Sequence, residues 1–241
     1  MRLGLLRCDE LSHSLVSVHG GYLDLFSELF SRVDPSVELA EYNVVAGELP
    51  SDPAEQDAWL VSGSTVSTYD DDPWIASLLD LLRNLDAARA PTVGVCFGHQ
   101  ALAQALGGNV RRSEGGWGVG LQPAVLTGAE GWISPSCLQF AIVYCHRDEV
   151  TALPDGARLI ASAKHCHIAA FARGDHILGI QGHPEFPTSF AADLYTEMAP
   201  TLGSENTAIA QNTLNDGTDR VDTARWILRF ISSRQGIERG A

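Results

Sequence analysis

The sequence predicts an α/β fold in which a mostly parallel central sheet is flanked by helices on both faces. Short apolar runs typical of buried strands alternate with amphipathic stretches typical of helices through the first half of the chain. At residues 90–108 a strand pattern, a sharp turn and a helix pattern follow one another, which is the repeating unit of such sheets. The 241 residues can bury a substantial core, and we expect residues 1–241 to form a single domain.

Each expected element has its own pattern. The strands are short runs rich in apolar or β-branched residues, at 3–6, 37–42, 58–62, 92–95, 121–126, 140–144, 159–163, 167–171 and 177–181. The helices carry apolar residues at helical spacing, at 22–33, 73–85, 101–106, 186–198 and 221–231. Asp72 before Pro73 is a typical helix start. The polar segment up to about Val18 is expected to be a loop, and residues 203–219 an irregular, mobile one.

Cys96 lies at the turn between a strand and a helix, with Gly94 and Gly98 two residues away on each side. This is the pattern of a nucleophile elbow, in which side chains at the flanking positions would crowd a strained backbone. The N-terminus of the following helix offers free N–H groups and a partial positive charge, both of which favour a thiolate. An ordinary buried cysteine at the end of a core strand is the alternative, and the two glycines argue against it.

Composition and charge exclude several classes of partner. The chain has 16 Lys and Arg against 30 Asp and Glu, a net charge of −14, without a basic cluster. A chain with this charge is not expected to bind nucleic acid or an anionic membrane surface. No apolar run reaches membrane-spanning length, and no signal segment is visible, so we expect a cytoplasmic protein.

The five cysteines are an odd number at irregular spacing, which suits neither a disulfide framework nor a zinc site. The triplet His165-Cys166-His167 could suggest a metal, but strand alternation would point both histidines away from Cys166. The glycine-dense segment 114–120 lacks the Lys-Ser/Thr ending of a phosphate loop. This segment either lets the backbone approach a small ligand or is simply a flexible loop. We therefore expect neither a metal nor a cofactor.

A cysteine nucleophile needs a base, and the base needs an orienting acceptor. His183 and Glu185 can supply both functions, because they follow the expected strand 177–181 and are separated by the stiff Pro184. The carboxyl ends of parallel strands meet at one edge of a sheet, so this segment and Cys96 should lie together.

With these residues the chain resembles a class I glutamine amidotransferase domain. The likeness spans nearly the whole sequence and is carried by four segments: Val61-Ser62-Gly63-Ser64, Gly94-Val95-Cys96-Phe97-Gly98-His99-Gln100, His146-Arg147-Asp148-Glu149-Val150 and Gln181-Gly182-His183-Pro184-Glu185-Phe186. The last two segments resemble those of stand-alone members of the γ-glutamyl peptidase type. The resemblance implies the flavodoxin-like class I glutaminase fold.

The resemblance also implies roles for single residues. Cys96, His183 and Glu185 match the family's catalytic triad. The backbone N–H groups of Gly63 and Phe97 would hold an oxyanion, and Gln100 occupies a position that contacts the glutamyl group. His146 and Asp148 are candidates for binding its α-amino and α-carboxylate ends, with a solvated turn as the alternative.

The implied function is hydrolysis of glutamine-type γ-amides through a γ-glutamyl thioester. Its substrate would be glutamine or a γ-glutamyl compound. The alternatives are a glutaminase subunit that supplies ammonia to a separate synthetase partner, and a non-catalytic regulatory protein of the same fold. Members that work with synthetases commonly have Phe where Gly182 stands, so we expect Gly182 to leave more space for an N-substituted leaving group.

Overall fold

The computed structural model describes residues 1–134, 137–215 and 217–238, without the side chains of 234–238. The described part of the chain contains a nine-stranded sheet in the order β2-β1-β3-β4-β11-β10-β9-β6-β7. Its strands, in chain order, are β1 (Arg2–Arg7), β2 (Glu38–Asn43), β3 (Ala58–Val61), β4 (Thr92–Val95), β6 (Gly118–Leu126), β7 (Gln139–His146), β9 (Ala157–Ala163), β10 (Cys166–Arg173) and β11 (Ile177–Ile180). A second sheet pairs β5 (Asn109–Arg112) with β8 (Asp148–Ala152).

The central sheet has a parallel part and an antiparallel extension. Strands β2, β1, β3, β4 and β11 run parallel to one another. From β11 onward, β10, β9, β6 and β7 each pair antiparallel with the neighbour before them. The predicted parallel core is confirmed, and hairpin pairing adds the second half of the sheet.

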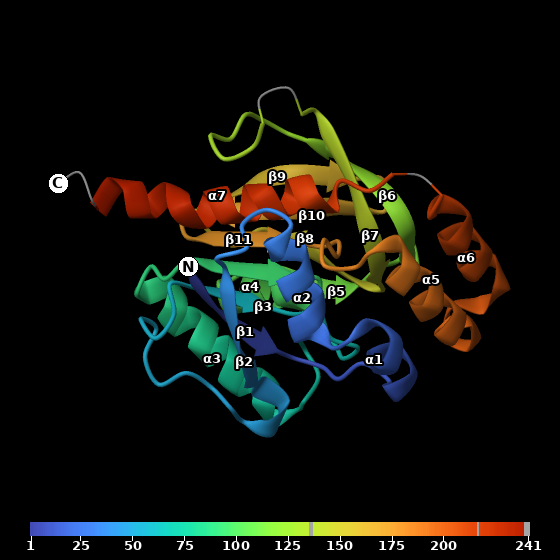
Figure 1. Ribbon diagram of the computed structural model, residues 1–241, viewed down its shortest axis with the longest axis horizontal. Helices are drawn as coiled ribbons and strands as arrows, with labels where there is room; N and C mark the ends of the chain where they lie inside the picture. The colour runs from blue at the N-terminus through green and yellow to red at the C-terminus, as the bar shows by residue number, and fades with distance from the viewer. Residues whose placement is uncertain (135–136, 216, 239–241) are drawn as a thin grey trace.

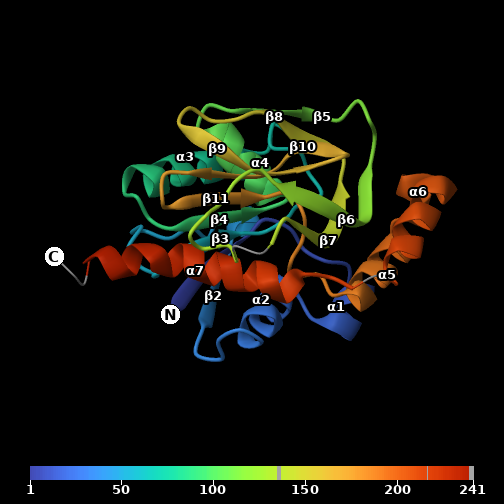
Figure 2. The same cartoon turned by 90° about the horizontal axis from the view of Figure 1, so that it is seen from above.

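Helices cover both faces of the sheet, as predicted. They are α1 (His13–His19), α2 (Tyr22–Ser31), α3 (Pro73–Ala87), α4 (Phe97–Ala105), α5 (Thr188–Glu197), α6 (Ala199–Thr213) and α7 (Arg220–Glu238), with a short 3₁₀ turn at Val44–Ala46. Figure 2 shows α2 and α7 on one side of the sheet and α3 and α4 on the other. In Figure 1, α7 lies along the sheet and α6 stands at the far end beside β6.

The apolar stripes of these helices build a core on each face. Phe26 and Phe30 of α2 are fully buried against one face, and Leu78 and Leu82 of α3 are fully buried against the other. Burying one such side chain stabilises a fold by about 1.5–3 kcal/mol. The two layers therefore hold the strands in a fixed register at the edge where the chain leaves β3, β4 and β11. No helix of the described residues has the length and apolar composition needed to cross a membrane.

Three neighbouring strands end side by side at that edge. Val61 of β3 is level with Gly94 of β4, and Val95 of β4 is level with Ile180 of β11. Cys96 follows β4 directly, and His183 comes three residues after the end of β11. Parallel pairing thus brings segments far apart in sequence to one place, which we call the carboxyl edge of the sheet.

The expectation that residues 203–219 form an irregular segment is wrong over most of that range. The segment 199–213 is helical, and Gly203, with φ of +79°, interrupts the helix near its start. Few of its residues are apolar, but Leu202 and Ala210 are buried, and the Thr213 hydroxyl accepts a hydrogen bond from the Leu121 N–H at 2.8 Å. Tertiary contacts with β6 therefore replace the apolar stripe that sequence reasoning looks for. Asp216 lies outside the described residues.

Other elements were also missed or shifted. Residues 13–19 form α1, which is capped by the Ser12 hydroxyl and held by the buried Leu15, where a loop was expected. Within the described residues, strands β5 and β8 pair only with each other, and each has a single buried residue, so neither carries a buried-strand pattern. Strand β6 begins at Gly118, inside the segment expected to be a glycine loop.

Candidate active site

The backbone at Cys96 has the strained conformation expected of an elbow. Cys96 has φ of +52° and ψ of −105°, a region that L-residues rarely adopt. A Cβ at Gly94 would lie 2.3 Å from the Gly98 carbonyl oxygen, and a Cβ at Gly98 would lie 2.4 Å from the Val61 carbonyl oxygen. Only glycine fits at these two positions. The tight turn places Cys96 at the N-cap of α4, where the helix presents its unpaired N–H groups.

His183 and Glu185 form a buried hydrogen-bonded pair beside Cys96. The Nδ1 atom of His183 lies 2.8 Å from Oε1 of Glu185, and both side chains are at least 95% buried. Cys96 lies beside the imidazole and interacts with it electrostatically, and its thiol donates to the Cys145 carbonyl at 3.9 Å. Phe186 stacks on the imidazole at 4.1 Å between ring centroids and 4° between planes. Glu185 and Phe186 thus fix the orientation of the ring next to Cys96.

The surroundings of His183 favour its charged form. Burial opposes the charge, but the Glu185 carboxylate and Cys96 together outweigh it and raise the pKa of His183 well above its ordinary value. An imidazolium that lies between a thiolate and a carboxylate is stabilised by both. The arrangement can therefore keep a proton on His183, next to Cys96, ready for transfer.

The backbone N–H groups of Gly63 and Phe97 are two candidate donors next to Cys96. A Cβ on Gly63 would be 2.9 Å from Cε1 of His183 and 3.7 Å from Cβ of Cys96, so Gly63 borders the reacting groups directly. Among the described residues, neither the Gly63 N–H nor the Phe97 N–H donates to a protein acceptor. Any side chain at position 63 would displace the imidazole.

Gln100, His146 and Asp148 are tied to one another by hydrogen bonds. The Gln100 side-chain amide donates to the Asp148 carbonyl at 2.8 Å, and Nδ1 of His146 lies 2.8 Å from the same oxygen. The Asp148 carboxylate accepts a hydrogen bond from the Ser67 hydroxyl. Asp148 thus begins β8 and is anchored, so the solvated turn considered above does not describe it.

Tyr144 and His165 complete this cluster, although the sequence drew attention to His165 only as part of a possible metal triplet. His165 lies 4.5 Å from Tyr144 and 5.3 Å from His146 between ring centroids. Within the described residues, the Tyr144 hydroxyl, Nε2 of His146 and both His165 nitrogens are buried without a hydrogen-bond partner. Burial and the neighbouring His165 together lower the pKa of His146 to about 3. Contacts between β7 and the β9–β10 turn create this cluster, and no local motif signals it.

The glycines near the site have packing roles. A Cβ at Gly118 would lie 2.4 Å from Nε2 of His146, which explains a glycine at the start of β6. A Cβ at Gly182 would lie 2.6 Å from Ile142 and 3.0 Å from Tyr144. The expectation that Gly182 leaves space for a leaving group is therefore wrong, because β7 side chains fill that space.

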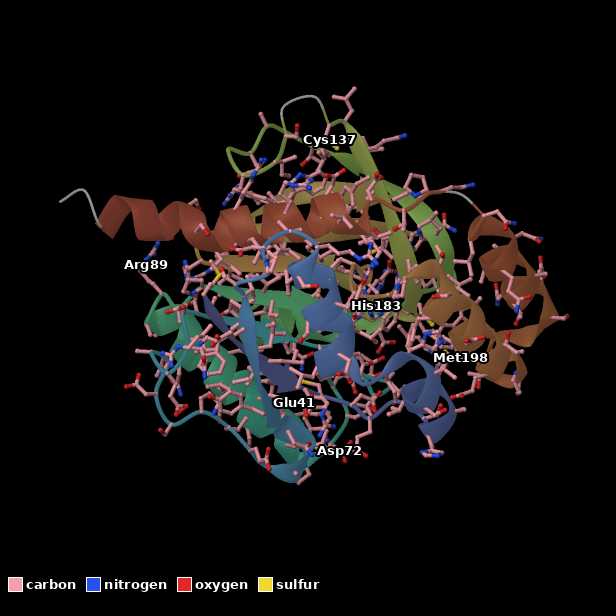
Figure 3. All side chains as sticks on the ribbon, viewed as in Figure 1. Glu41, Asp72, Arg89, Cys137, His183 and Met198 are labelled. Carbon is pink, nitrogen blue, oxygen red and sulfur yellow. The ribbon has the colours of Figure 1, made fainter. Side chains whose placement is uncertain are left out.

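The other four cysteines differ from Cys96. Burial raises the pKa of Cys8, Cys145 and Cys166, and for Cys145 and Cys166 the pKa reaches about 12. Cys137 is partly exposed, and Figure 3 shows it well away from His183. The described residues contain no group of three His, Cys, Asp or Glu side chains that could hold a metal ion.

Comparisons with known proteins identify the family. A family model described as glutamine amidotransferase class-I matches residues 20–196. The chain is 34% identical over 194 residues to gamma-glutamyl peptidase 5 of Arabidopsis thaliana, with 77% of this chain and 76% of the relative covered. Gamma-glutamyl peptidase 3 of the same plant is also 34% identical, with 76% of each chain covered.

Solved structures show the same fold. A glutamine amidotransferase from Thermotoga maritima superposes with a TM-score of 0.74 at 16% identity, and 97% of each chain is covered. One from Methylobacillus flagellatus has a TM-score of 0.72 at 22% identity, with 97% of this chain and 92% of that chain covered. The flavodoxin-like fold expected from the sequence is confirmed. The chain belongs to the class I glutamine amidotransferase family.

Proposed function

We propose that the protein is a cysteine hydrolase of γ-glutamyl amides. The observation that carries this proposal is the buried His183–Glu185 hydrogen bond next to Cys96, where the Gly63 and Phe97 N–H groups have no acceptor among the described residues. A thiolate, a protonated base and an oxyanion site are the three parts that acyl transfer from an amide requires.

In the first half-reaction the Cys96 thiolate attacks the side-chain carbonyl carbon of the γ-glutamyl amide. The Gly63 and Phe97 N–H groups hold the resulting oxyanion. The carbon–nitrogen bond then breaks as the His183 imidazolium gives its proton to the leaving nitrogen. An amine leaves, and the γ-glutamyl group remains on Cys96 as a thioester.

In the second half-reaction water replaces the amine. Neutral His183 removes a proton from the water as its oxygen attacks the thioester carbon, and Glu185 stabilises the imidazolium that forms. The carbon–sulfur bond breaks, so the Cys96 thiolate is regenerated and glutamate leaves. Gln100, His146 and Asp148 border the glutamyl group in this scheme, because Gln100 is in α4, which begins at Cys96, and the His146–Asp148 segment follows Cys145, whose carbonyl accepts from the Cys96 thiol.

We propose an N-substituted γ-glutamyl compound, an amine conjugate or peptide, as the preferred substrate. The support is the likeness to two proteins named gamma-glutamyl peptidases over three quarters of the chain. The alternative is a glutaminase subunit that passes ammonia to a separate synthetase. A non-catalytic protein of this fold would be expected to lack one of the three polar residues, and all three are present.

The test is kcat/KM of the purified protein for a γ-glutamyl peptide and for free glutamine. We expect the peptide to be hydrolysed faster. A preference for glutamine that emerges only when a synthetase is added would favour the ammonia-supplying alternative.

The same assay tests the assigned residues. Cys96→Ala should abolish turnover, and His183→Ala should lower kcat by about 10²–10⁴-fold, since both proton transfers lose their carrier. The matched control is Cys137→Ala, which removes a partly exposed thiol far from the site and should leave kcat unchanged. Turnover by Cys96→Ala at the wild-type rate would contradict the assignment.

A further inference from the structure

We propose that Arg220 is a positioning residue for this reaction: its guanidinium holds the backbone of Pro184 and Glu185, and through it the Glu185 carboxylate, in place on His183. The inference rests on the proposed function and adds to it a residue 35 positions beyond Glu185. Arg220 does not touch the substrate or the reacting atoms in this scheme.

The contacts of Arg220 converge on the segment that carries the base. Its Nε donates to the Pro184 carbonyl at 3.1 Å, and one terminal nitrogen donates to the Glu185 carbonyl at 3.1 Å. The same terminal nitrogen lies 2.8 Å from a carboxylate oxygen of Glu28 on α2. Arg220 is 6% exposed. A single planar group therefore joins the His183–Phe186 loop, α7 and α2.

The two carbonyls need this donor. They follow the end of β11, where the chain turns away from the sheet and the ladder of strand hydrogen bonds has stopped. A buried carbonyl without a donor is unfavourable, because it has lost its hydrogen bonds to water and gained none in return. The guanidinium satisfies both carbonyls in a fixed fork geometry, which a lysine ammonium cannot reproduce.

The position of Arg220 is fixed by Asp219, the preceding residue, which is hydrogen-bonded to Ala141. The Asp219 N–H donates to the Ala141 carbonyl at 2.8 Å, and the Ala141 N–H donates to the Asp219 carboxylate at 2.8 Å. Ala141 belongs to β7, the strand that also accepts the His183 N–H at its Val143 carbonyl, at 2.7 Å. The start of α7 and the His183–Phe186 loop are thus both hydrogen-bonded to β7, at Ala141 and Val143, which are two residues apart.

This arrangement links Arg220 to the chemistry by one short path. Glu185 has no freedom to move its carboxylate independently, because that side chain is 0% exposed and its backbone carbonyl is bound by Arg220. If the carbonyl is released, the 2.8 Å contact between Glu185 and His183 loses its fixed geometry. A misplacement of about 1 Å can lower a rate by about 10²-fold.

The kinetic test compares Arg220→Met, Arg220→Lys and Arg225→Met on a γ-glutamyl substrate. Arg225 is the matched control, because it also lies near the start of α7 and forms an ion pair with Asp222, but its side chain is 40% exposed. We expect Arg220→Met to lower kcat by about 10²-fold with KM changed less than threefold, Arg220→Lys to recover part of the loss, and Arg225→Met to match wild type.

A second readout does not depend on the substrate. In the Cys96→Ala background, NMR titration follows the His183 imidazole, which is faced by Glu185 from its own loop, by residue 96 from the elbow and by His146 from β7. Adding Arg220→Met should lower the pKa of His183 because Glu185 loses its alignment. If the wild type hydrolyses no γ-glutamyl amide, the proposed function fails and this titration still decides the role of Arg220.

A folded Arg220→Met variant with wild-type kcat and an unchanged His183 titration would overturn the inference. If Arg220→Met does not fold, Arg220→Lys and Glu28→Gln take its place. Glu28 is partly exposed, and its substitution removes the ion pair while leaving both carbonyl contacts. A smaller loss of kcat in Glu28→Gln than in Arg220→Lys is then the supporting result, and equal or reversed losses contradict it.

Discussion

At the scale of single residues, Cys96, the proposed nucleophile, has an unfavourable backbone conformation. A non-glycine residue in such a conformation costs about 1–3 kcal/mol, and the surrounding fold has to impose it. Gly94 and Gly98 make room for the turn, and the Cys96 N–H donates to the Ile180 carbonyl at 2.9 Å, which ties the elbow to β11. The elbow therefore stores strain at the nucleophile.

This strain predicts that Cys96→Gly is more stable than Cys96→Ala. Glycine adopts a φ of +52° without steric cost, whereas alanine keeps the strain of the native residue. We expect a difference of about 1 kcal/mol in the free energy of unfolding, after the greater entropy of glycine in the unfolded chain is included. Urea denaturation of both inactive variants measures it, and a less stable glycine variant would show that the elbow is relaxed.

The site residues that the sequence indicated share one property. Cys96, His183 and Glu185 are adjacent to strand ends, and their spacing within short segments already restricts their geometry. Arg220 and His165 could not be found in this way, because their roles arise from contacts with residues far away in the sequence. A charged residue at a helix start and a histidine in a hairpin turn look like ordinary surface residues until the chain is folded.

At the scale of elements, the best-predicted helices and strands have clear apolar periodicity, and the missed ones do not. The helix α6 has a weak apolar stripe, and β5 and β8 are mostly exposed, so their existence depends on neighbours. The sequence likewise does not predict the antiparallel order of β10, β9, β6 and β7, because short apolar runs do not specify which strands pair with one another.

One side chain illustrates how these elements are joined. The Tyr195 hydroxyl of α5 donates to the Tyr144 carbonyl at 2.6 Å and accepts from the Gly120 N–H at 2.8 Å. Tyr195 is fully buried. Tyr195→Phe should therefore lower the free energy of unfolding by about 1–3 kcal/mol, because both backbone groups lose their partner.

The matched control for that substitution is Tyr144→Phe. The Tyr144 hydroxyl is equally buried but has no hydrogen-bond partner among the described residues. Its removal should leave stability unchanged or increase it slightly. Chemical denaturation of both variants makes the comparison, and equal losses would show that these hydrogen bonds contribute nothing net.

At the scale of the whole molecule, buried histidines set the response to acid. Burial lowers the pKa of His99 and His146 to about 3 and of His165 to about 4. Below pH 6.5 these three histidines take up protons in the unfolded chain but stay neutral in the folded chain. The stability that comes from keeping them neutral is therefore present near neutrality and is lost as the pH falls toward 4.

We expect each of the three histidines to contribute about 1.4 kcal/mol of lost stability per pH unit in that range. Unfolding free energies measured at several pH values between 4 and 7.5 give the total slope. His165→Asn should reduce the slope by about one proton, and its effect at pH 7.5 isolates the change in packing. An unaltered slope would mean that His165 already takes up a proton in the folded protein.

The hydrogen bonds on β7 have a consequence for association between molecules. This strand is the last in the sheet, and an open strand at that place can pair with another chain. The His183 N–H and Asp219 occupy its free side at Val143 and Ala141. The segment that carries His183 thus also shields the sheet, so a substitution that frees this loop should promote aggregation as well as lower the proposed activity.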